Sequence, residues 1–192
     1  MKVVVLSDTH GFVDPDIPEM ARKADLVVHA GDIGRAEVLD GLKPRCGQLF
    51  AVAGNNDTEA KWPPGDYAVL KALPESMELD LPGGILAVEH GHRIWDTANY
   101  HGRLRLKYPG ARVVAYGHTH VRKVDKERRP WVLNPGAAGR VRTKGGASCL
   151  LLTVNSNRWR GMRCAGRNPR EYYRPVFKIL AEGSAELPVF YL

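Results

Sequence analysis

Five short stretches of the chain combine carboxylate, amide and imidazole side chains, the oxygen and nitrogen donors that bind divalent metals. They are Asp8-Thr9-His10, Gly31-Asp32, Gly54-Asn55-Asn56-Asp57, His90-Gly91-His92 and Gly117-His118-Thr119-His120. No cysteine adjoins them, so the donor set suits Mn²⁺, Fe, Zn²⁺, Co²⁺ or Ni²⁺ better than a structural zinc. The candidate ligands are too many for one ion. They suffice for two ions about 3.5–4 Å apart if one carboxylate bridges them.

Each polar stretch follows directly on a short apolar run that is rich in β-branched residues. We expect these runs to be strands, over Lys2–Leu6, Leu26–Ala30, Gln48–Ala53, Ile85–Glu89 and Val113–Tyr116. The carboxyl ends of strands form the edge at which α/β sheets collect ligands, so the pattern predicts one shared site. Asp8 and His10, like His118 and His120, are two residues apart and point the same way in an extended segment.

The remaining pattern predicts an α/β fold. Two more strands are expected over Pro130–Leu133 and Ser148–Val154, and helices over Ile17–Lys23, Ala36–Leu42 and Thr97–Lys107. Alternation of strands and helices in the first half favours parallel strands. Met77–Leu81 alternates apolar and polar residues, and Pro82-Gly83-Gly84 then turns the chain into a hairpin. Two stacked sheets with flanking helices accommodate both patterns.

The composition of the 192 residues is that of a globular protein, with 44% hydrophobic and 26% charged residues. No apolar run approaches the ~20 residues that cross a bilayer. The apolar run at the N-terminus is too short for a signal peptide, and the three scattered cysteines fit a reducing compartment. We therefore expect a cytoplasmic protein with no membrane partner. The net charge of +7 favours anionic partners, with nucleic acid and phosphorylated metabolites both open.

Most of the excess positive charge lies near the C-terminus. Between residues 155 and 178, seven basic residues stand against one acid, with Trp159, Tyr172, Tyr173 and Phe177 interleaved. Such a stretch could bind single-stranded nucleic acid through phosphate contacts and stacking. We favour a solvated edge strand and a docked terminal segment, with packed aromatics and hydrated arginines. The expected organisation is one catalytic domain over residues 1–154 and an extension over 155–192, packed on that domain or at an oligomer interface.

The ordered series of motifs resembles the calcineurin-like metallophosphoesterase family, whose pattern runs D-x-H, GD, GN(H/C)D, H and GHxH. The compact length and the Asn134-Pro135-Gly136 turn are similar to the small phosphodiesterases of the YfcE type. The resemblance covers about residues 1–154 and implies a four-layer α/β/β/α sandwich of two mixed sheets flanked by helices.

The resemblance also implies how the ligands divide between two ions. One ion would be held by Asp8, His10, Asp32 and His120, and the other by Asp32, Asn55, His90 and His118, so that Asp32 bridges. Asp57 would steer a side chain of its own loop. His29 and His101 are expected to be structural. Two such ions, with Mn²⁺ favoured, would lower the pKa of a bound water and supply the hydroxide that attacks a phosphate ester.

Asn56 is the main departure from the family pattern. Many members carry a histidine there, which binds the phosphoryl group and can protonate the leaving group. An amide donates a hydrogen bond but cannot act as a general acid. We expect Asn56 and His92 to orient the phosphoryl group, although His92 can equally be a loop residue, and we expect good leaving groups to be favoured. Ala137, where relatives often have serine, is expected to matter little.

These observations predict a binuclear-metal-dependent phosphodiesterase that acts on a small phosphate ester, with a homo-oligomer left open. A nuclease or nucleotide hydrolase of the same superfamily is an alternative motivated by the basic tail. A non-catalytic protein-binding scaffold has a precedent in the retromer subunit of this fold, but every ligand position is filled here. A protein serine/threonine phosphatase is disfavoured because no Asp-Arg-Gly follows Gly31-Asp32.

Overall fold

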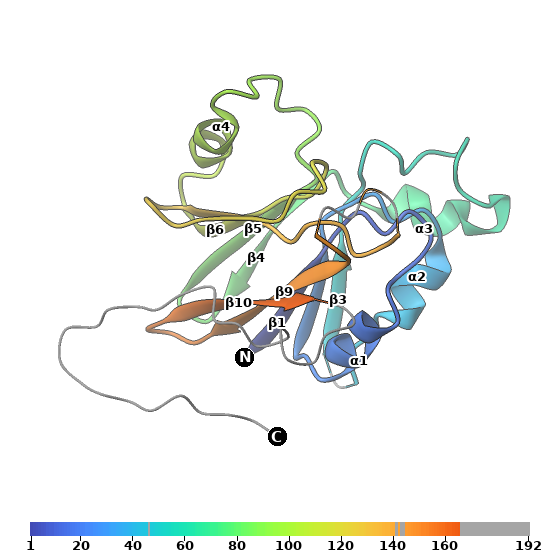
Figure 1. The fold of residues 1–192 in the computed structure, drawn as a ribbon, viewed down its shortest axis with the longest axis horizontal. Coiled ribbons are helices and arrows are strands. Elements are labelled where there is room, and N and C mark those ends of the chain that lie inside the picture. Colours follow the sequence, from blue (N-terminus) through green and yellow to red (C-terminus); the bar gives the residue numbers. More distant parts are fainter. Residues whose placement is uncertain (46, 141, 143–144, 166–192) are drawn as a thin grey trace.

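The computed structural model describes residues 1–45, 47–140, 142 and 145–165. The chain forms two five-stranded mixed sheets, with strand orders β10-β9-β1-β2-β3 and β4-β5-β6-β8-β7 (Figure 1). The first sheet contains β1 (Lys2–Leu6), β2 (Leu26–His29), β3 (Gln48–Ala51), β9 (Ser148–Val154) and β10 (Trp159–Ala165). Its first three strands are parallel, β9 pairs antiparallel with β1, and β10 pairs antiparallel with β9.

The second sheet begins with a hairpin and continues with parallel pairs. Its strands are β4 (Ser76–Leu81), β5 (Gly84–Glu89), β6 (Ala111–Ala115), β7 (Lys123–Asp125) and β8 (Trp131–Asn134). Strands β5, β6 and β8 are parallel, and β4 and β7 are antiparallel edges. The helices are α1 (Asp16–Arg22), α2 (Ala36–Gly41), the 3₁₀ helix η1 (Pro64–Asp66), α3 (Tyr67–Ala72) and α4 (Tyr100–Lys107).

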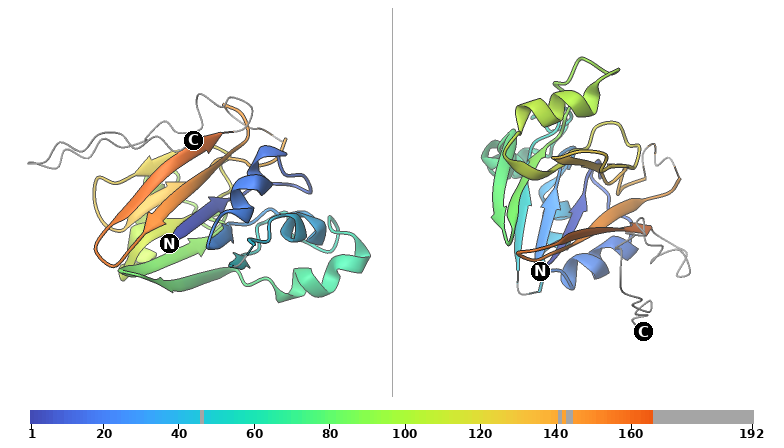
Figure 2. Two further views of the ribbon diagram at one scale, coloured as in Figure 1. Left: turned by 90° about the horizontal axis from the view of Figure 1, so that it is seen from below. Right: turned by 90° about the vertical axis from the view of Figure 1, so that its left-hand side faces the viewer.

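Alternation of apolar residues along the strands builds the layers. Along β1, Val3 and Val5 pack between the two sheets, whereas Val4 and Leu6 pack toward α1, α2 and α3. On the far side, α4 covers the outer face of the second sheet through the buried Leu104. The result is the four-layer α/β/β/α sandwich that the sequence predicted, with helices on both outer faces (Figure 2).

The seven predicted strands, the hairpin and the three predicted helices are all present, with some of their ends displaced. Helix α4 begins at Tyr100, three residues later than predicted, because the preceding residues form a turn in which the Asn99 N–H donates to Asp96 Oδ1 (3.0 Å). Strand β7 and the η1–α3 segment were not predicted. Both are short, and β7 is a three-residue edge strand that pairs antiparallel with β8.

The first sheet continues beyond residue 154 into β10. Trp159 is 1% exposed, and its indole N–H donates to the Pro82 carbonyl in the β4–β5 turn (2.9 Å), while Arg160 is exposed. This part of the basic segment is an edge strand with a packed aromatic, the interpretation favoured from the sequence. Residues 166–192, which include Tyr172, Tyr173 and Phe177, lie outside the described residues.

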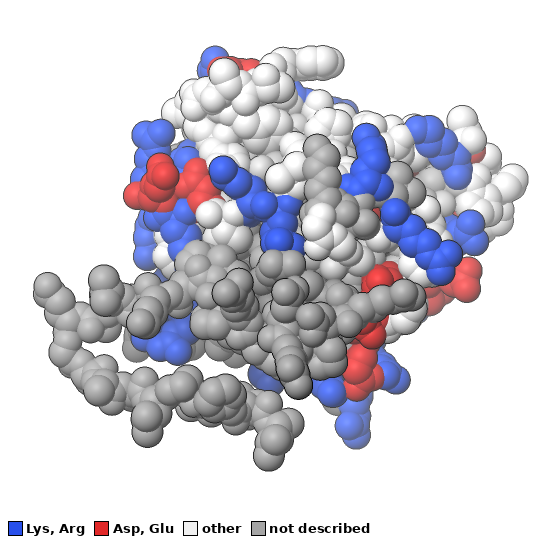
Figure 3. All heavy atoms as spheres, in the orientation of Figure 1, with Lys and Arg blue, Asp and Glu red and all other residues white. Residues whose placement is uncertain are grey.

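Charges of both signs share the described surface. On the face in Figure 3, lysine and arginine side chains are spread over several elements, and acidic side chains lie beside some of them. Exposed ion pairs include Lys43–Asp40 (2.6 Å) and Arg103–Asp96 (2.9 Å). Among the described residues, none of the helices has the length and apolar character needed to span a membrane.

Candidate metal centre

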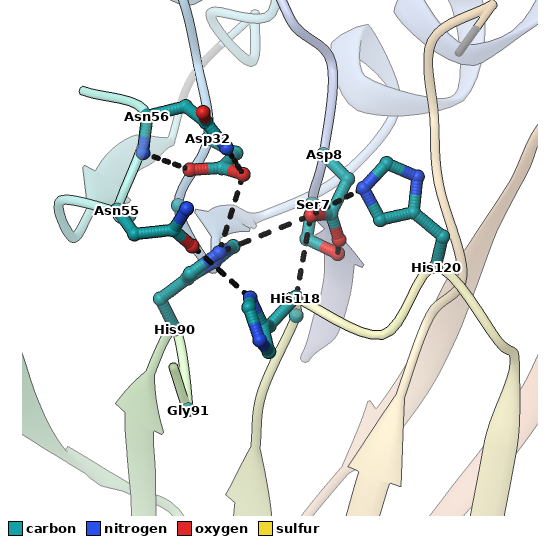
Figure 4. Close-up of polar contacts among 12 residues, drawn as sticks. Ser7, Asp8, Asp32, Asn55, Asn56, His90, Gly91, His118 and His120 are labelled. Carbon is teal, nitrogen blue, oxygen red and sulfur yellow. Dashed lines mark hydrogen bonds and ion pairs between the residues drawn. The ribbon is translucent and has the colours of Figure 1, made fainter. Parts of the chain in front are cut away.

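The five polar stretches meet at one edge of the molecule, where β1, β2, β3, β5 and β6 end (Figure 4). Backbone hydrogen bonds join the loops that carry them. The Asp8 N–H donates to the Gly31 carbonyl (3.0 Å) and the His10 N–H to the Asp32 carbonyl (2.9 Å). From the second sheet, the His118 N–H donates to Asp8 Oδ1 (3.2 Å), which connects loops from both sheets. The shared site predicted from the strand ends is therefore formed.

The backbone of this site is held in an unusual conformation. Six described non-glycine residues have a positive φ, and five of them are Asp8, His10, Asp32, His118 and His120, with φ between 48° and 67°. Such conformations cost about 1–3 kcal/mol each and persist only where the surroundings enforce them, as they do at functional sites. Strain concentrated in the candidate ligands indicates that their placement serves a purpose other than stability.

Four side chains form the tightest cluster of potential ligands. Each of Asp8, His10, Asp32 and His120 offers one ligand atom, and these atoms all lie within 4.8 Å of one another. His120 Nε2 lies 3.2 Å from Asp8 Oδ1 and 3.2 Å from His10 Nε2, and His10 Nε2 lies 3.7 Å from Asp32 Oδ2. Two carboxylates and two imidazoles that converge in this way fit a divalent cation.

His90 approaches the same carboxylates from β5. Its Nδ1–H donates to the Ala30 carbonyl (2.8 Å), so its Nε2 faces Asp32 Oδ2 (3.4 Å) and Asp8 Oδ1 (4.0 Å). This Nε2 is buried and has no hydrogen-bond partner. In metal-ligating histidines, one ring nitrogen typically donates to a carbonyl or carboxylate while the other nitrogen faces the metal, and His90 has this arrangement. Nearby, His118 Nδ1 donates to Asn55 Oδ1 (3.0 Å).

The electrostatics of the site also favour a cation. Burial alone would raise the pKa of Asp32, but the neighbouring His90 and two hydrogen bonds from Asn56 hold it well below its usual range. Burial alone would lower the pKa of His90, but Asp32 and Asp8 outweigh it and raise that pKa above its ordinary value. Asp32 is therefore ionised at neutral pH, and its charge attracts a proton or a metal ion to the same place.

Asn56 lies against the predicted bridging carboxylate. Its backbone N–H donates to Asp32 Oδ1 (2.8 Å) and its Nδ2 to Asp32 Oδ2 (2.6 Å), as Figure 4 shows, while Lys61 Nζ donates to its Oδ1. The amide thus orients Asp32 and leaves no acidic group at the position where many family members have histidine.

Asp57 joins two of the loops. Its carboxylate accepts hydrogen bonds from the backbone N–H groups of Ile33 (2.9 Å), Gly34 (3.0 Å) and Gly54 (2.7 Å), and from the Trp62 indole (2.9 Å). Four donors engage both oxygens, so Asp57 positions the loops that carry Asp32 and Asn56.

Two glycines let these loops approach closely. A Cβ on Gly31, whose φ is +91°, would lie 2.7 Å from His90 Nδ1 and 2.9 Å from Gly54 N. A Cβ on Gly54 would overlap the Asp32 carboxylate. Only glycine fits at either position without displacing a candidate ligand.

The other histidines differ in their surroundings. His29 is fully buried beneath the site, contacts Thr9 Oγ1 (2.9 Å) and accepts from the Gly31 N–H (3.2 Å), and burial lowers its pKa to about 4, as befits a structural residue. The His92 ring lies 5.6 Å from that of His90, and its buried Nδ1 has no hydrogen-bond partner. His101 makes structural hydrogen bonds but also lines a cavity beside the candidate ligands.

That cavity has a volume of about 770 Å³ and begins at the ligand cluster. It is lined by Asp32, Asn55, Asn56, Ile94, Thr97, Tyr100, His101, Tyr116, His118, Thr119, Val121, Lys123 and Arg142. The sequence did not single out Arg142, whose Nη2 lies 3.2 Å from His120 Nε2, nor the aromatic residues Tyr100 and Tyr116. No motif marks these positions, because Tyr100 and Tyr116 reach the cavity only through the packing of α4 and β6, and Arg142 reaches it from the β8–β9 loop.

A two-sheet α/β/β/α fold with carboxylates and imidazoles gathered at the strand ends defines the metal-dependent phosphoesterase class. A sequence profile described as "Calcineurin-like phosphoesterase superfamily domain" matches residues 1–157. The chain therefore belongs to the calcineurin-like phosphoesterase superfamily.

Curated relatives agree with this assignment, and a solved structure shares the fold. "Probable metallophosphoesterase MJ0623" of Methanocaldococcus jannaschii is 31% identical over 146 residues, which cover 71% of this chain and 68% of the relative. "Phosphodiesterase MJ0936" of the same organism is 27% identical over 146 residues, covering 71% and 83%. Wild-type Vps29 of Entamoeba histolytica, solved in complex with Zn²⁺, shares the fold with a TM-score of 0.67 and 18% identity over 85% and 91% of the two chains.

Proposed function

We propose that this protein is a phosphodiesterase that works with two divalent cations, Mn²⁺ foremost, on a small phosphate ester. The observation that carries the proposal is the cluster of Asp8, His10, Asp32 and His120 beside the buried, unbonded Nε2 of His90. The relative named a phosphodiesterase supports a diester substrate.

The ligands divide around Asp32. The first ion would be bound by Asp8, His10, Asp32 and His120, and the second by Asp32, Asn55, His90 and His118. Asp32 suits the bridging role because its Oδ2 lies close to a ligand of each set, 3.4 Å from His90 Nε2 and 3.7 Å from His10 Nε2. When bound, the two cations would activate a water molecule and neutralise charge on the phosphoryl oxygens.

The remaining side chains position the ester. Asn56 and Arg142 both line the cavity next to the ligands and carry N–H donors suited to phosphoryl oxygens. The Asn56 amide supplies no proton to the departing oxygen, so esters whose leaving group is stable as an anion are preferred. His92, at the edge of the ligand cluster, helps to orient the phosphoryl group.

The test is hydrolysis of bis(4-nitrophenyl) phosphate and of 4-nitrophenyl phosphate, each with added Mn²⁺ and with chelator. We expect turnover that requires the metal and favours the diester. A preference for the monoester would contradict the diester assignment. Binding of metal without turnover of either ester would contradict the enzymatic proposal and favour the scaffold alternative.

A further inference from the structure

Three aromatic rings line one side of the cavity and contact one another. The ring centroids of Tyr100 and Tyr116 are 5.0 Å apart, those of His101 and Tyr116 5.6 Å, and those of Tyr100 and His101 6.4 Å. All three residues line the cavity that begins at the candidate ligands. We call Tyr100, His101 and Tyr116 the aromatic wall.

The polar atoms of the aromatic wall are engaged with the protein. The Tyr100 hydroxyl donates to the Gly91 carbonyl (2.7 Å), and the Tyr116 hydroxyl lies 2.9 Å from His101 Nε2. His101 Nδ1 in turn donates to Asp125 Oδ2 (2.7 Å), which makes Nε2 the acceptor for Tyr116. Tyr116 is only 3% exposed, so the ring surface offered to the cavity comes mainly from the half-buried Tyr100 and His101. Such ring surface recognises a planar ligand by stacking.

The wall is also fixed in place. Helix α4 carries Tyr100 and His101 at its start, and at its far end the Tyr108 hydroxyl donates to the buried Glu89 (2.6 Å). In the middle, Arg105 forms an ion pair with Asp125 (2.6 Å). These contacts of α4 and Tyr108 to β5 and β7 preorganise the rings, so little ordering would be needed on binding.

Apart from Ile94 and Val121, the rest of the cavity lining is polar, with one acid, Asp32, and two cations. Lys123 and Arg142 contribute positive groups, Thr97 and Thr119 contribute hydroxyls, and Asn55, Asn56 and His118 form the end next to the ligands. A volume of about 770 Å³ is in the range of sites for whole small-molecule ligands and exceeds what a phosphoryl group fills.

We propose that this cavity selects phosphodiesters in which one ester group is a nucleoside, with its base stacked on the aromatic wall and its phosphate at the ligand cluster. The ring surface would stack on the base, and the threonine hydroxyls and the cations would bind the sugar and additional phosphate oxygens. A mixed lining of this kind suits a ligand that has both an aromatic and an anionic part. The inference rests on the proposed function, since it names the substrate class of that same site.

The experiment compares two esters with the same leaving group: thymidine 5′-(4-nitrophenyl phosphate) and methyl 4-nitrophenyl phosphate, both with Mn²⁺. We expect kcat/KM to be about tenfold higher for the thymidine ester, the effect of stacking one base on an aromatic side chain. Tyr100→Leu, which removes the ring, is expected to bring the ratio of the two kcat/KM values to about one. Tyr100→Phe, which keeps the ring and loses the bond to Gly91, is expected to retain the ratio.

Leu106→Ala is the matched control, because Leu106 lies on the same helix, is 72% exposed and does not line the cavity. It should leave both kcat/KM values unchanged. Calorimetry with thymidine 5′-monophosphate and methyl phosphate gives a second readout that needs no turnover, and the nucleotide is expected to bind about tenfold more tightly.

The outcomes separate the two proposals. Equal hydrolysis of the two esters together with equal binding of the two phosphates by the unmodified protein would overturn the nucleoside inference and leave the phosphodiesterase proposal standing. Tighter binding of the nucleotide that depends on Tyr100, without hydrolysis of either ester, would support the nucleoside site and overturn the enzymatic proposal. A ratio that persists in Tyr100→Leu would place the recognition elsewhere and overturn the role of the wall.

Discussion

The ligand cluster and the aromatic wall line the same cavity, yet they are built in opposite ways. In the cluster and the adjoining His118, five residues have strained backbones, a buried carboxylate is held ionised, and the neighbouring His90 Nε2 has no hydrogen-bond partner. In the wall, none of the three residues has a positive φ, and the hydroxyl and imidazole groups bond to the protein itself.

This difference shows what each region is made to receive. A cluster with concentrated charge and an unsatisfied buried nitrogen is suited to bind a cation, because coordination would offset the backbone strain and give the buried nitrogen a partner. A wall whose polar atoms already have hydrogen-bond partners is suited to pack against an apolar or aromatic ligand surface. Substitutions in the cluster should therefore affect metal binding and turnover, and substitutions in the wall should affect stability and the choice of ester.

The largest effect is expected for Asp32→Ala. Loss of a residue that merely supports a metal ligand typically costs about 10–100-fold in affinity or activity, so loss of the proposed bridging ligand should cost more than ~100-fold in diester hydrolysis. Metal content after dialysis and the rate with bis(4-nitrophenyl) phosphate provide the measurement.

Asp40→Ala is the control for that substitution, since Asp40 is an exposed acid on α2 whose carboxylate, within the described part of the chain, pairs only with Lys43. It should behave like the unmodified protein. Near-normal turnover by Asp32→Ala after removal and restoration of the metal would show that Asp32 does not bridge. It would also contradict the claim that the cluster controls metal-dependent turnover.

A smaller, opposite effect is expected for Asn56→His. A positioned general acid typically contributes about 10²–10⁴-fold, and an imperfectly placed one should still raise turnover of an ester with an aliphatic leaving group by about tenfold. The gain should be much smaller with a nitrophenyl ester, whose leaving group needs no proton. Steady-state rates on both esters test this, and an equal or absent gain would contradict the explanation for the missing acid.

The smallest effect is expected for Tyr116→Phe in the wall. Removing the hydroxyl leaves His101 Nε2 without its partner and should lower the free energy of unfolding by about 1 kcal/mol, while the ring remains. Denaturant unfolding measures the loss, and Tyr67→Phe, which removes an exposed hydroxyl bonded to the Glu59 carbonyl, is the comparison. A change in the metal content of Tyr116→Phe without a change in its free energy of unfolding would contradict the assignment of metal binding to the cluster alone.

The sequence predicted the cluster well because its signals are local. Asp8, Asp32 and His118 each stand just past an apolar run, and strand ends of an α/β sheet meet at one edge. The fold class followed from the same runs, because alternation along β1 and its neighbours sorts residues into the space between the sheets and the space under the helices.

The wall and the loop contacts could not be predicted in the same way. Tyr100 and Tyr116 are sixteen residues apart and meet only because α4 folds back over the end of β6. His101 was expected to be structural, and its position in the cavity wall depends on Asp125, which lies on a strand too short to recognise. Asp57 was expected to steer a side chain of its own loop. Its carboxylate accepts four hydrogen bonds, and their donors lie in two different loops.

The most direct test of the two-cation proposal is a titration of metal-free protein with Mn²⁺, in which bound metal and diester hydrolysis are recorded on the same samples. We predict that two ions bind per chain and that hydrolysis rises with the second equivalent, since both proposed sets of ligands share Asp32. Full activity after one equivalent, or two bound ions without hydrolysis, would contradict the proposal.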